Sequence, residues 1–477
     1  MRAEPAAADA PLLASVSDTP IGRSLPPGFI GTSLEYSALH LYTGRDPRAI
    51  DPVLLQLLRQ LAPGQAPVLR IGGDSTDDTW WPIKGVIPPG GVTYGLDNGW
   101  LRTTHALAAD LGARLILGIN LSANRPALSG AEGRALLEGI GAKYIAAFEI
   151  GNEPNLYGVF PWYRNRLGHV FYARRHGRYN LSALTKDYSR WAKTLPNAPL
   201  AGPAFSNPDW MSGLGQFLSA EPKVRIVTYH RYPLRACIND PTTRGFATID
   251  SLLNDRSSAG LAQGVAPFVS VAHARGLQFR LGELNSASCK GRPGVSDTFA
   301  SALWVLDTLF NLASVGVDGV NIHTLPGSAY EPATFSQSPN GTWQAFVHPE
   351  YYGLLMFAHA FPAGAHLLPV TAPLGPVKVW ATLAPDGKTR VVLINKDTVA
   401  EHSVQLQLPG AVTGASLESL QAPSVSSTSG VTLGGQTFGA QTTTGAFPGP
   451  ESTTAISPPL GFYSIDLPPA GAVMLTQ

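Results

Sequence analysis

Residues 146–154 read AAFEIGNEP, a short apolar run that carries two carboxylates and ends in turn-forming Gly, Asn and Pro. Seven other segments between Phe29 and Thr324 have the same form, and helix-like stretches follow several of them. Alternating strands and helices predict a parallel sheet with crossover connections. Eight strands within about 300 residues predict an α/β fold of the closed (β/α)8 TIM-barrel type. The eight predicted strands are Phe29–Tyr36, Pro67–Asp74, Ala113–Asn120, Ala146–Pro154, Ala198–Phe205, Val224–Pro233, Gln278–Asn285 and Gly316–Thr324.

Two of the intervening helices are clear from their apolar spacing. Ser296–Phe310 places Phe299, Leu303, Leu306 and Phe310 on one face, with Ser296 or Asp297 as the expected N-terminal cap. Asp51–Leu61 is the second predicted helix. Both stretches follow predicted strands, as a barrel requires.

The pattern changes after about residue 365, where short strand-like runs are separated by Pro, Gly and Asp-Gly turns without a convincing helix. This predicts an additional antiparallel β-sandwich domain. The segment Pro11–Arg23 has no helix signal and is expected to add a strand to it. The predicted domains are a catalytic barrel at 27–362 and a sandwich made of 1–26 plus 363–477. The predicted sandwich strands are Val377–Ala381, Arg390–Ile394, Ser403–Leu408, Val431–Leu433, Thr453–Ile456 and Phe462–Leu467.

The composition excludes several classes of protein. The chain has 477 residues and a net charge of +1, whereas nucleic-acid binders show a basic excess. Its apolar fraction of 44% is too high for a disordered chain, and no apolar run approaches the roughly 18 residues of a membrane span. Few charges and only two cysteines suit an exported protein. We therefore expect a secreted or periplasmic monomer with no nucleic-acid or membrane partner.

Two carboxylates stand at strand ends, where (β/α)8 barrels carry their chemistry. Glu153 ends the fourth predicted strand and Glu283 the seventh. Cleavage of a glycosidic bond requires such a pair, because one carboxyl protonates the leaving oxygen while the other attacks the anomeric carbon or activates water. We expect Arg70 and Tyr232 to donate hydrogen bonds that keep Glu283 ionised. No metal-ligand spacing is present, so neither a metal nor a cofactor is predicted.

Four sequence motifs carry a resemblance to a known family of glycosidases. They are GTSLEY at 31–36, LRIGGDSTD at 69–77, EIGNEPN at 149–155, and Gly282-Glu283 followed by GVSDTF at 294–299. In this order, at corresponding strand ends, they resemble glycoside hydrolase family 79, which holds heparanases and microbial β-glucuronidases within the retaining glycosidases of clan A. The resemblance implies that Glu153 is the acid/base and Glu283 the nucleophile. It also implies that Asn152 bonds the 2-hydroxyl of the sugar.

The resemblance assigns further residues to the sugar pocket. Glu35 and Asp74 match positions that contact the terminal sugar; the alternatives are a turn residue and a helix cap. Tyr330, with backbone amides near residues 327–329, matches the group that binds the carboxylate of a uronic acid; the alternative is a packing role. His230 and His323 are expected to line the cleft as satisfied polar groups rather than as metal ligands, and His230 is assigned to substrate binding.

Two loops add to the site. Cys237 follows the sixth strand and Cys289 the seventh, so their loops lie side by side and a Cys237–Cys289 disulfide is predicted; two free thiols are the alternative. The stretch Leu156–Tyr179 carries five arginines among aromatic residues, a composition that suits an acidic sugar chain. A solvated flap is the alternative reading of this stretch.

The leading hypothesis is a retaining exo-β-glucuronidase that releases terminal glucuronic acid, or its 4-O-methyl form, from polysaccharides or proteoglycans by double displacement. One alternative is an endo-β-glucuronidase of the heparanase type. The other is a non-catalytic carbohydrate-binding protein on the same fold. In each case the expected partner is an acidic glycan.

Overall fold

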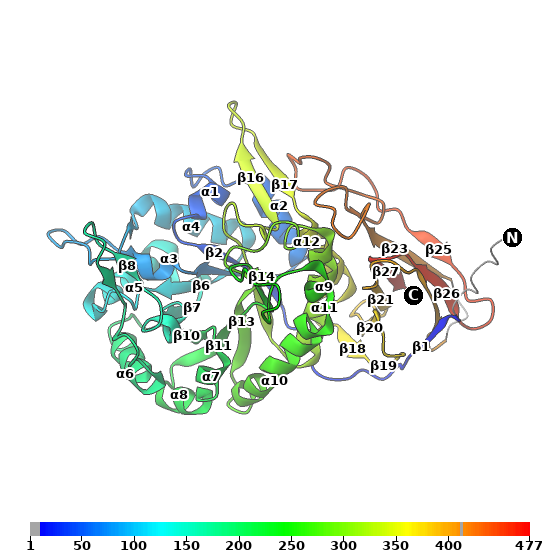
Figure 1. The fold of residues 1–477 in the computed structure, drawn as a ribbon. Helices are drawn as coiled ribbons and strands as arrows, with labels where there is room; N and C mark the ends of the chain where they lie inside the picture. The colour runs from blue at the N-terminus through cyan, green and yellow to red at the C-terminus, as the bar shows by residue number, and fades with distance from the viewer. Residues whose placement is uncertain (1–9, 411–413) are drawn as a thin grey trace.

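Eight parallel strands close into a barrel in the order β10-β11-β13-β15-β2-β3-β6-β7 (Figure 1). The computed structural model describes residues 10–410 and 414–477. The predicted TIM barrel is confirmed, and only β7 begins outside its predicted run, by one residue. Barrel strands read as nearly continuous apolar runs because both faces are buried; in β6 only Arg114 is exposed. The strands are β2 Ile30–Glu35, β3 Val68–Gly72, β6 Arg114–Ile119, β7 Ile145–Ile150, β10 Leu200–Phe205, β11 Val224–Arg231, β13 Gln278–Leu284 and β15 Gly319–His323.

Helices connect successive strands and cover the outside of the barrel. The side chain of Asp51 caps α2 by accepting a hydrogen bond from the backbone of Val53. The longest helix, α11, begins at Phe299 with Thr298 as its cap residue, which corrects the expected cap at Ser296 or Asp297. Those two side chains instead accept hydrogen bonds within the preceding turns. The principal helices are α2 Pro52–Leu61, α4 Asn98–Leu111, α5 Pro126–Ile140, α6 Leu181–Ala192, α8 Leu214–Ala220, α10 Ala259–His273, α11 Phe299–Ser314 and α12 Pro349–Ala360.

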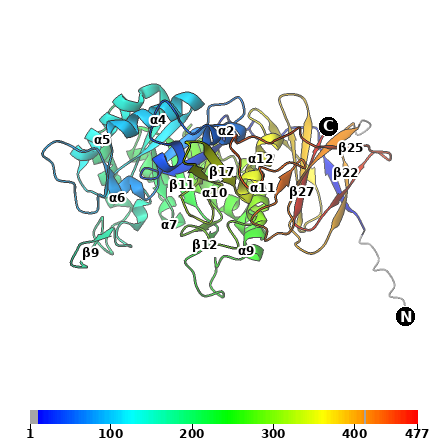
Figure 2. The ribbon, with the colours of Figure 1, turned by 90° about the horizontal axis from the view of Figure 1, so that it is seen from above.

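The second architectural unit is a sandwich of two sheets beside the barrel (Figure 2). One sheet has the order β19-β1-β22-β26 and the other β18-β20-β21-β27-β23-β24, with β25 paired to β23. The N-terminal strand β1 does join the sandwich, but it runs parallel to β22, an exception to the antiparallel pattern. Its strands are β1 Leu12–Val16, β18 His366–Leu368, β19 Val370–Thr371, β20 Val377–Leu383, β21 Thr389–Asn395, β22 His402–Gln407, β23 Ala415–Gln421, β24 Thr432–Leu433, β25 Thr454–Ile456, β26 Tyr463–Leu467 and β27 Gly471–Thr476.

Four of these strands, β18, β19, β23 and β27, are missing from the sequence prediction. Of these, β23 and β27 pair with each other inside the larger sheet. Residues 1–9 of the predicted sandwich segment lie outside the described residues. The domain limits 27–362 and 1–26 plus 363–477 remain a prediction.

Barrel and sandwich are joined by a shared apolar core and by a buried ion pair. Phe310 of α11 stacks on Trp380 of β20 with ring centroids 5.4 Å apart. Lys396, which follows β21, forms an ion pair with Asp307 of α11, and the two side chains are 5% and 1% exposed. The Nε1 of Trp380 donates to the same aspartate at 3.0 Å. These contacts fix the sandwich against the side of the barrel.

Replacing Lys396 by Met should lower the free energy of unfolding by about 3–5 kcal/mol, because Asp307 would keep its burial and lose its ammonium partner. Urea or thermal unfolding measures this loss. Lys378→Met is the matched control, since its partner Asp255 is 58% exposed and the expected loss is below about 1 kcal/mol. Equal losses in the two variants would contradict a special role of the buried pair.

Candidate active site

The polar residues singled out in the sequence meet at the C-terminal end of the barrel strands. Arg70, His230 and Glu283 lie within β3, β11 and β13. Glu35 is the last residue of β2. The remaining predicted residues follow strand ends: Asp74 after β3, Asn152 and Glu153 after β7, Tyr232 after β11, and Tyr330 after β15.

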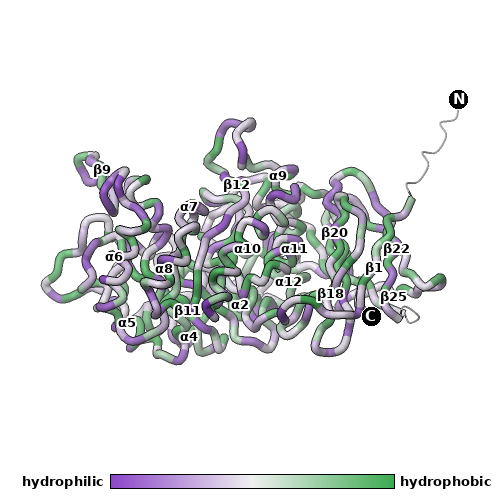
Figure 3. The backbone as a smooth tube through the Cα atoms, turned by 90° about the horizontal axis from the view of Figure 1, so that it is seen from below, coloured by the Kyte–Doolittle hydropathy of each residue, from purple (hydrophilic) through white to green (hydrophobic). Residues whose placement is uncertain are grey.

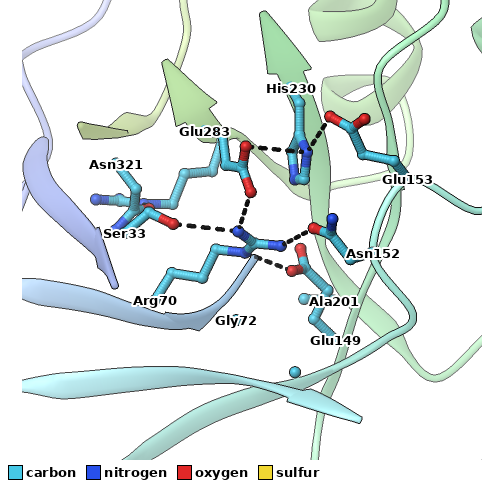
Figure 4. A network of polar contacts seen from close by, with 12 residues as sticks. Ser33, Arg70, Gly72, Glu149, Asn152, Glu153, Ala201, His230, Glu283 and Asn321 are labelled. Atoms are coloured by element: carbon cyan, nitrogen blue, oxygen red, sulfur yellow. Dashed lines mark hydrogen bonds and ion pairs between the residues drawn. The ribbon is translucent and has the colours of Figure 1, made fainter. Parts of the chain in front are cut away.

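Arg70 is fully buried at the centre of this group (Figure 4). Its Nε donates to Glu149 Oε2 at 2.6 Å, and its Nη1 donates to Glu283 Oε1 at 2.7 Å. Nη2 donates to Asn152 Oδ1 at 2.8 Å. One guanidinium therefore fixes three side chains, two from β7 and the turn after it and one from β13.

Glu283 is surrounded by donors. Besides Arg70, the hydroxyl of Tyr232 donates to Glu283 Oε2 at 2.8 Å. Burial alone would raise the pKa of Glu283, but His230, His323 and Arg70, together with the Tyr232 hydrogen bond, hold it well below its ordinary value. These groups favour the ionised form of Glu283, which is the form that a nucleophile needs.

Glu153 faces Glu283 across His230. His230 Nδ1 lies 3.0 Å from Glu153 Oε1 and 3.7 Å from Glu283 Oε2. Burial would lower the pKa of His230, but the two glutamates raise it above its ordinary value. The backbone of Glu153 has φ +46°, a left-handed conformation that is uncommon for glutamate and that occurs at the turn where β7 leaves the barrel.

The two carboxylates are close enough to act on one bond. One oxygen from each carboxylate and one nitrogen of His230 all lie within 4.8 Å of one another. Within residues 10–410 and 414–477, this is the one set of three such groups with the spacing of a metal site. Glu283 already accepts hydrogen bonds from Arg70 and Tyr232, so the protein's own donors occupy the positions a cation would compete for.

Glu35 and Asp74 form an adjoining acidic pair. Glu35 accepts hydrogen bonds from the backbone of Asp74 at 3.1 Å and of Ser75 at 2.8 Å. A Cβ at Gly73, where φ is +70°, would lie 1.9 Å from Glu35 Oε1, so only glycine permits this approach. Burial and the nearby Asp74 raise the pKa of Glu35 to about 8. Burial, Glu153 and Glu283 raise the pKa of Asp74 to about 7.

The capping alternative for Asp74 does not fit the structure, whereas Glu35 does begin a turn, since the backbone N–H of Ala38 donates to its carbonyl at 3.2 Å. Asp74 precedes the short helix α3, Ser75–Asp78, but its side chain makes no capping hydrogen bond. Its Oδ1 instead accepts from Asn152 Nδ2 at 3.0 Å. Asn152 is thereby oriented by Arg70 on one side and Asp74 on the other.

Tyr330 lies in the pocket, but the amides expected beside it are already engaged. Its ring centroid is 6.3 Å from that of Tyr232 and 5.9 Å from that of His323. The backbone N–H groups of residues 327, 328 and 329 donate to Glu331 Oε2, Leu325 O and Lys290 O. The predicted role of these amides in carboxylate binding is therefore wrong, because the loop folds back on itself and uses them internally.

A disulfide joins Cys237 and Cys289 with Cα atoms 5.7 Å apart, and it links the loops after β11 and β13. A short parallel pair, β12 Leu234–Arg235 with β14 Ala287–Ser288, reinforces the link. Cys289 and Lys290 both have positive φ, so the bonded loop holds two consecutive non-glycine residues in the left-handed region. This loop supports Tyr330 through the Lys290 carbonyl.

The arginine-rich stretch after Glu153 forms a hairpin of β8 Tyr163–Arg164 and β9 Val170–Phe171, which projects from the barrel on the same side as the β12 segment (Figure 3). Arg174 does not face the cleft. Its guanidinium pairs with Asp187 at 2.7 Å and donates to the carbonyls of Leu121 and Ser122. These contacts hold the hairpin against α6 and the loop after β6.

His323, a residue predicted to line the cleft, lies beside Ser33 and Glu35. Its Nδ1 is 3.1 Å from Ser33 Oγ and its Nε2 is 3.7 Å from Glu35 Oε1.

The structure adds Asp77, which sequence reasoning did not assign to the site. Asp77 accepts hydrogen bonds from the backbone of Leu121, Ser122 and Asn152 and from the hydroxyl of Tyr157. No sequence signal pointed to Asp77, because its partners are distant in sequence and most of them are backbone groups.

Comparison with known proteins shows which family the chain resembles. The description "Glycosyl hydrolase family 79 C-terminal beta domain" matches residues 379–474. The chain is 24% identical to a β-glucuronidase of Neurospora crassa over 430 residues, 80% of this chain and 74% of that protein. It is 26% identical to a heparanase of Gallus gallus over 357 residues, 63% of this chain and 64% of that protein. The chain is a glycoside hydrolase that resembles family 79.

Solved structures agree with the fold of this hydrolase. A 4-O-α-L-rhamnosyl-β-D-glucuronidase from Fusarium oxysporum superposes with a TM-score of 0.73 at 20% identity, covering 98% of this chain and all of that one. A family 51 arabinofuranosidase from Xanthomonas axonopodis gives 0.70 at 14% identity and 98% coverage. At these identities the likeness concerns the fold alone. None of the described helices combines the length and apolarity needed to cross a membrane.

Replacing Tyr232 by Phe should lower kcat/KM about 10- to 100-fold, because Glu283 loses one of the donors that hold it ionised and aligned. Steady-state kinetics on an aryl glycoside measure the effect. Tyr229→Phe is the matched control, since Tyr229 lies in β11, three residues before Tyr232, with its ring against Arg231 and no hydrogen bond from its hydroxyl to Glu283. Equal losses in both variants would contradict the assigned role of the Tyr232 hydroxyl.

Glu35→Gln should change how stability depends on pH. Folded Glu35 keeps its proton up to about pH 8, whereas the unfolded chain releases it near pH 4. The unfolded state therefore binds fewer protons between these values, and this residue makes the unfolding free energy fall as the pH rises. The variant should gain at least about 1 kcal/mol relative to wild type between pH 5 and pH 8. Urea unfolding of wild type and variant at pH 5 and pH 8 tests this. An equal change of the unfolding free energy with pH in the two proteins would contradict it.

Proposed function

We propose that this hydrolase is a retaining exo-β-glucuronidase that removes terminal glucuronic acid, or its 4-O-methyl form, from polysaccharides or proteoglycans. One observation carries the proposal: carboxylate oxygens of Glu153 and Glu283 lie within 4.8 Å of each other, with one carboxylate held ionised by Arg70 and Tyr232. Retaining glycosidases place their carboxyl groups about 5–5.5 Å apart, whereas inverting enzymes need about 6.5–9.5 Å to admit a water. The short separation favours retention.

The chemistry follows from the two environments. Glu283 Oε attacks the anomeric carbon while the Glu153 carboxyl gives its proton to the leaving oxygen, so the glycosidic C–O bond breaks and a glycosyl ester forms. Water then enters on the Glu153 side. Glu153 takes its proton as the water oxygen attacks the anomeric carbon and the ester bond breaks, which restores Glu283 as a carboxylate.

Asn152 is placed to bind the 2-hydroxyl of the bound sugar. Arg70 and Asp74 fix the orientation of its amide, with Nδ2 turned to the cleft side where Asp74 lies. A hydrogen bond at this hydroxyl strengthens in the transition state, so a pre-oriented amide contributes to the rate as well as to binding.

The preference for a uronic acid is supported by the charge state of the pocket. Protonated Glu35 and Asp74, with pKa values of about 8 and about 7, add little negative charge beside an anionic sugar at mildly acidic pH. The hydroxyl of Tyr330 is the proposed donor to the sugar carboxylate. Two relatives, from Neurospora crassa and Aspergillus niger, are named β-glucuronidases, which supports the same substrate.

The proposal extends to location and assembly. The Cys237–Cys289 disulfide suits an oxidising compartment, so we propose that the enzyme is secreted or periplasmic. We propose that it acts as a monomer, because all the residues assigned to the site come from one chain.

Turnover of 4-nitrophenyl β-glucuronide tests the catalytic assignment. Glu283→Gln and Glu153→Gln should each lower kcat by about a thousandfold or more, because each removes a group that reacts. Glu401→Gln, a change at an exposed position between β21 and β22, is the control and should leave turnover unchanged. If the wild-type protein binds oligosaccharide but is as inactive as Glu283→Gln, the enzyme hypothesis is wrong and the carbohydrate-binding alternative is supported.

Product analysis completes the test. Proton NMR should show the β anomer of glucuronic acid as the first product, and an α anomer would contradict retention. Polysaccharide digests should release monosaccharide; internal fragments alone would contradict exo action and support the heparanase-type alternative.

A further inference from the structure

A groove of about 790 Å³ lies between the loop that follows β11 and the N-terminal end of α10. Its volume is within the range of about 300–1,000 Å³ that is usual for small-molecule sites. The segment between β12 and α9, Ile249–Leu253, forms one wall of the groove and projects from the barrel (Figure 3). Residues 254–261, which lead into α10, form the other wall.

The groove lies on the outer side of β11, away from the catalytic residues. His230 faces the two glutamates at the barrel mouth, and successive residues of a strand point to opposite sides. Arg231 accordingly lies over the ring of Tyr229, 5.7 Å from its centroid, and Tyr229 packs against Phe268 of α10. The groove shares no lining residue with the catalytic site. A ligand bound there would leave the catalytic carboxylates free.

Three arginines without a carboxylate partner line this groove. Arg231 ends β11, Arg244 lies on the projecting loop, and Arg256 lies in the turn before α10. Asp250 is the one acidic residue among the lining residues. Asp255, the neighbour of Arg256, pairs with two lysines that do not line the groove. The groove therefore carries a net positive charge. Among residues 10–410 and 414–477, the arginines that form ion pairs are Arg23, Arg48, Arg70, Arg174, Arg190 and Arg390.

The wall that carries Arg244 is held in a fixed conformation. The disulfide and the β12–β14 pair join it to the loop after β13. Within the wall, the backbone N–H of Arg235 donates to the carbonyl of Gly245 at 2.8 Å. The Cζ of Arg292 lies 4.2 Å from the centroid of the Phe246 ring. A wall with these contacts needs little further ordering when a ligand binds, which favours affinity.

Apolar side chains lie among the arginines. Leu234 and Leu261 line the groove, together with the half-buried ring of Phe246. Apolar and aromatic surfaces pack on the C–H faces of sugars, while guanidinium groups form paired hydrogen bonds with carboxylates and sulfates. A free inorganic anion would use the arginines alone. The combination therefore fits a chain of acidic sugars better than a small anion.

We propose that this groove is a second, non-catalytic binding site for acidic polysaccharide, which holds the chain by its carboxylate or sulfate groups. The choice of ligand rests on the proposed β-glucuronidase function, whereas the charge and the apolar lining belong to the groove itself. A site of this kind raises the local concentration of a polymeric substrate and has no effect on a small glycoside.

Calorimetric titration with an α-linked oligomer of galacturonic acid tests the proposal. This oligomer carries a carboxylate on every sugar and has no β-glucuronide bond to cleave. A neutral xylose oligomer of the same length is the control ligand. The variants Arg244→Gln and Arg256→Gln each remove one charge from an exposed position of the groove. Arg178→Gln is the control variant, since Arg178 is an exposed arginine after β9 that does not line the groove.

Wild type should bind the acidic oligomer and not the neutral one. Each groove variant should raise the Kd for the acidic oligomer about tenfold, because one charge-assisted contact is lost. Arg178→Gln should leave the Kd unchanged. Raising the ionic strength from about 0.05 M to about 0.5 M should weaken binding to wild type about tenfold or more. The kcat/KM on 4-nitrophenyl β-glucuronide should be the same in all four proteins.

Three results would overturn the proposal. The first is an unchanged Kd in both groove variants, as expected if the oligomer binds only at the catalytic site. The second is an equal loss in Arg178→Gln, because binding would then follow the net charge. The third is binding of inorganic sulfate or of the neutral oligomer as tight as that of the acidic oligomer. Failure of the proposed function gives a different result, since wild type would then not cleave the aryl glucuronide whether or not the groove binds the oligomer.

Discussion

A buried guanidinium organises the barrel mouth. Arg70 has no exposure to solvent, and its charge is compensated by Glu149 below and Glu283 above. A buried charge of this kind is tolerated only when its partners and hydrogen bonds are complete, and removing one partner leaves the others uncompensated. The same group orients Asn152, so the positions of the nucleophile and of the amide beside it are coupled through one side chain from β3.

The surroundings of Glu283, Glu35 and Asp74 shift the pKa values of these carboxyl groups in different directions. Burial acts on all of them in the direction of the neutral acid. Arg70, Tyr232 and the histidines overcome it at Glu283, whereas neighbouring carboxylates add to it at Glu35 and Asp74. Glu283, Glu35 and Asp74 therefore share one cleft without three negative charges, which limits the repulsion among them.

The sequence predicts the barrel and the composition of its mouth well, for a physical reason. Parallel strands buried on both faces leave apolar runs, and the polar residue after each run must lie at the barrel end, as Glu153 and Glu283 do. The conformations of the loops are harder to predict from the sequence. The amides of residues 327–329 are consumed by contacts with Glu331, Leu325 and Lys290 that depend on the folded loop. Trp162 packs against the loop at Gly91, where a Cβ would lie 2.7 Å from the indole, and this long-range contact leaves no local pattern in the sequence.

The disulfide between Cys237 and Cys289 spans 52 residues of sequence and joins two loops that flank the nucleophile. The β11–β13 ladder does not need it, since the strands pair through six residue partners of their own. Reduction would therefore spare the barrel and release the supports of Tyr330. Protein produced in a reducing cytosol would still fold, but it would contain molecules with and without the Cys237–Cys289 bond. Its specific activity would therefore depend on the fraction of molecules in which the disulfide has formed.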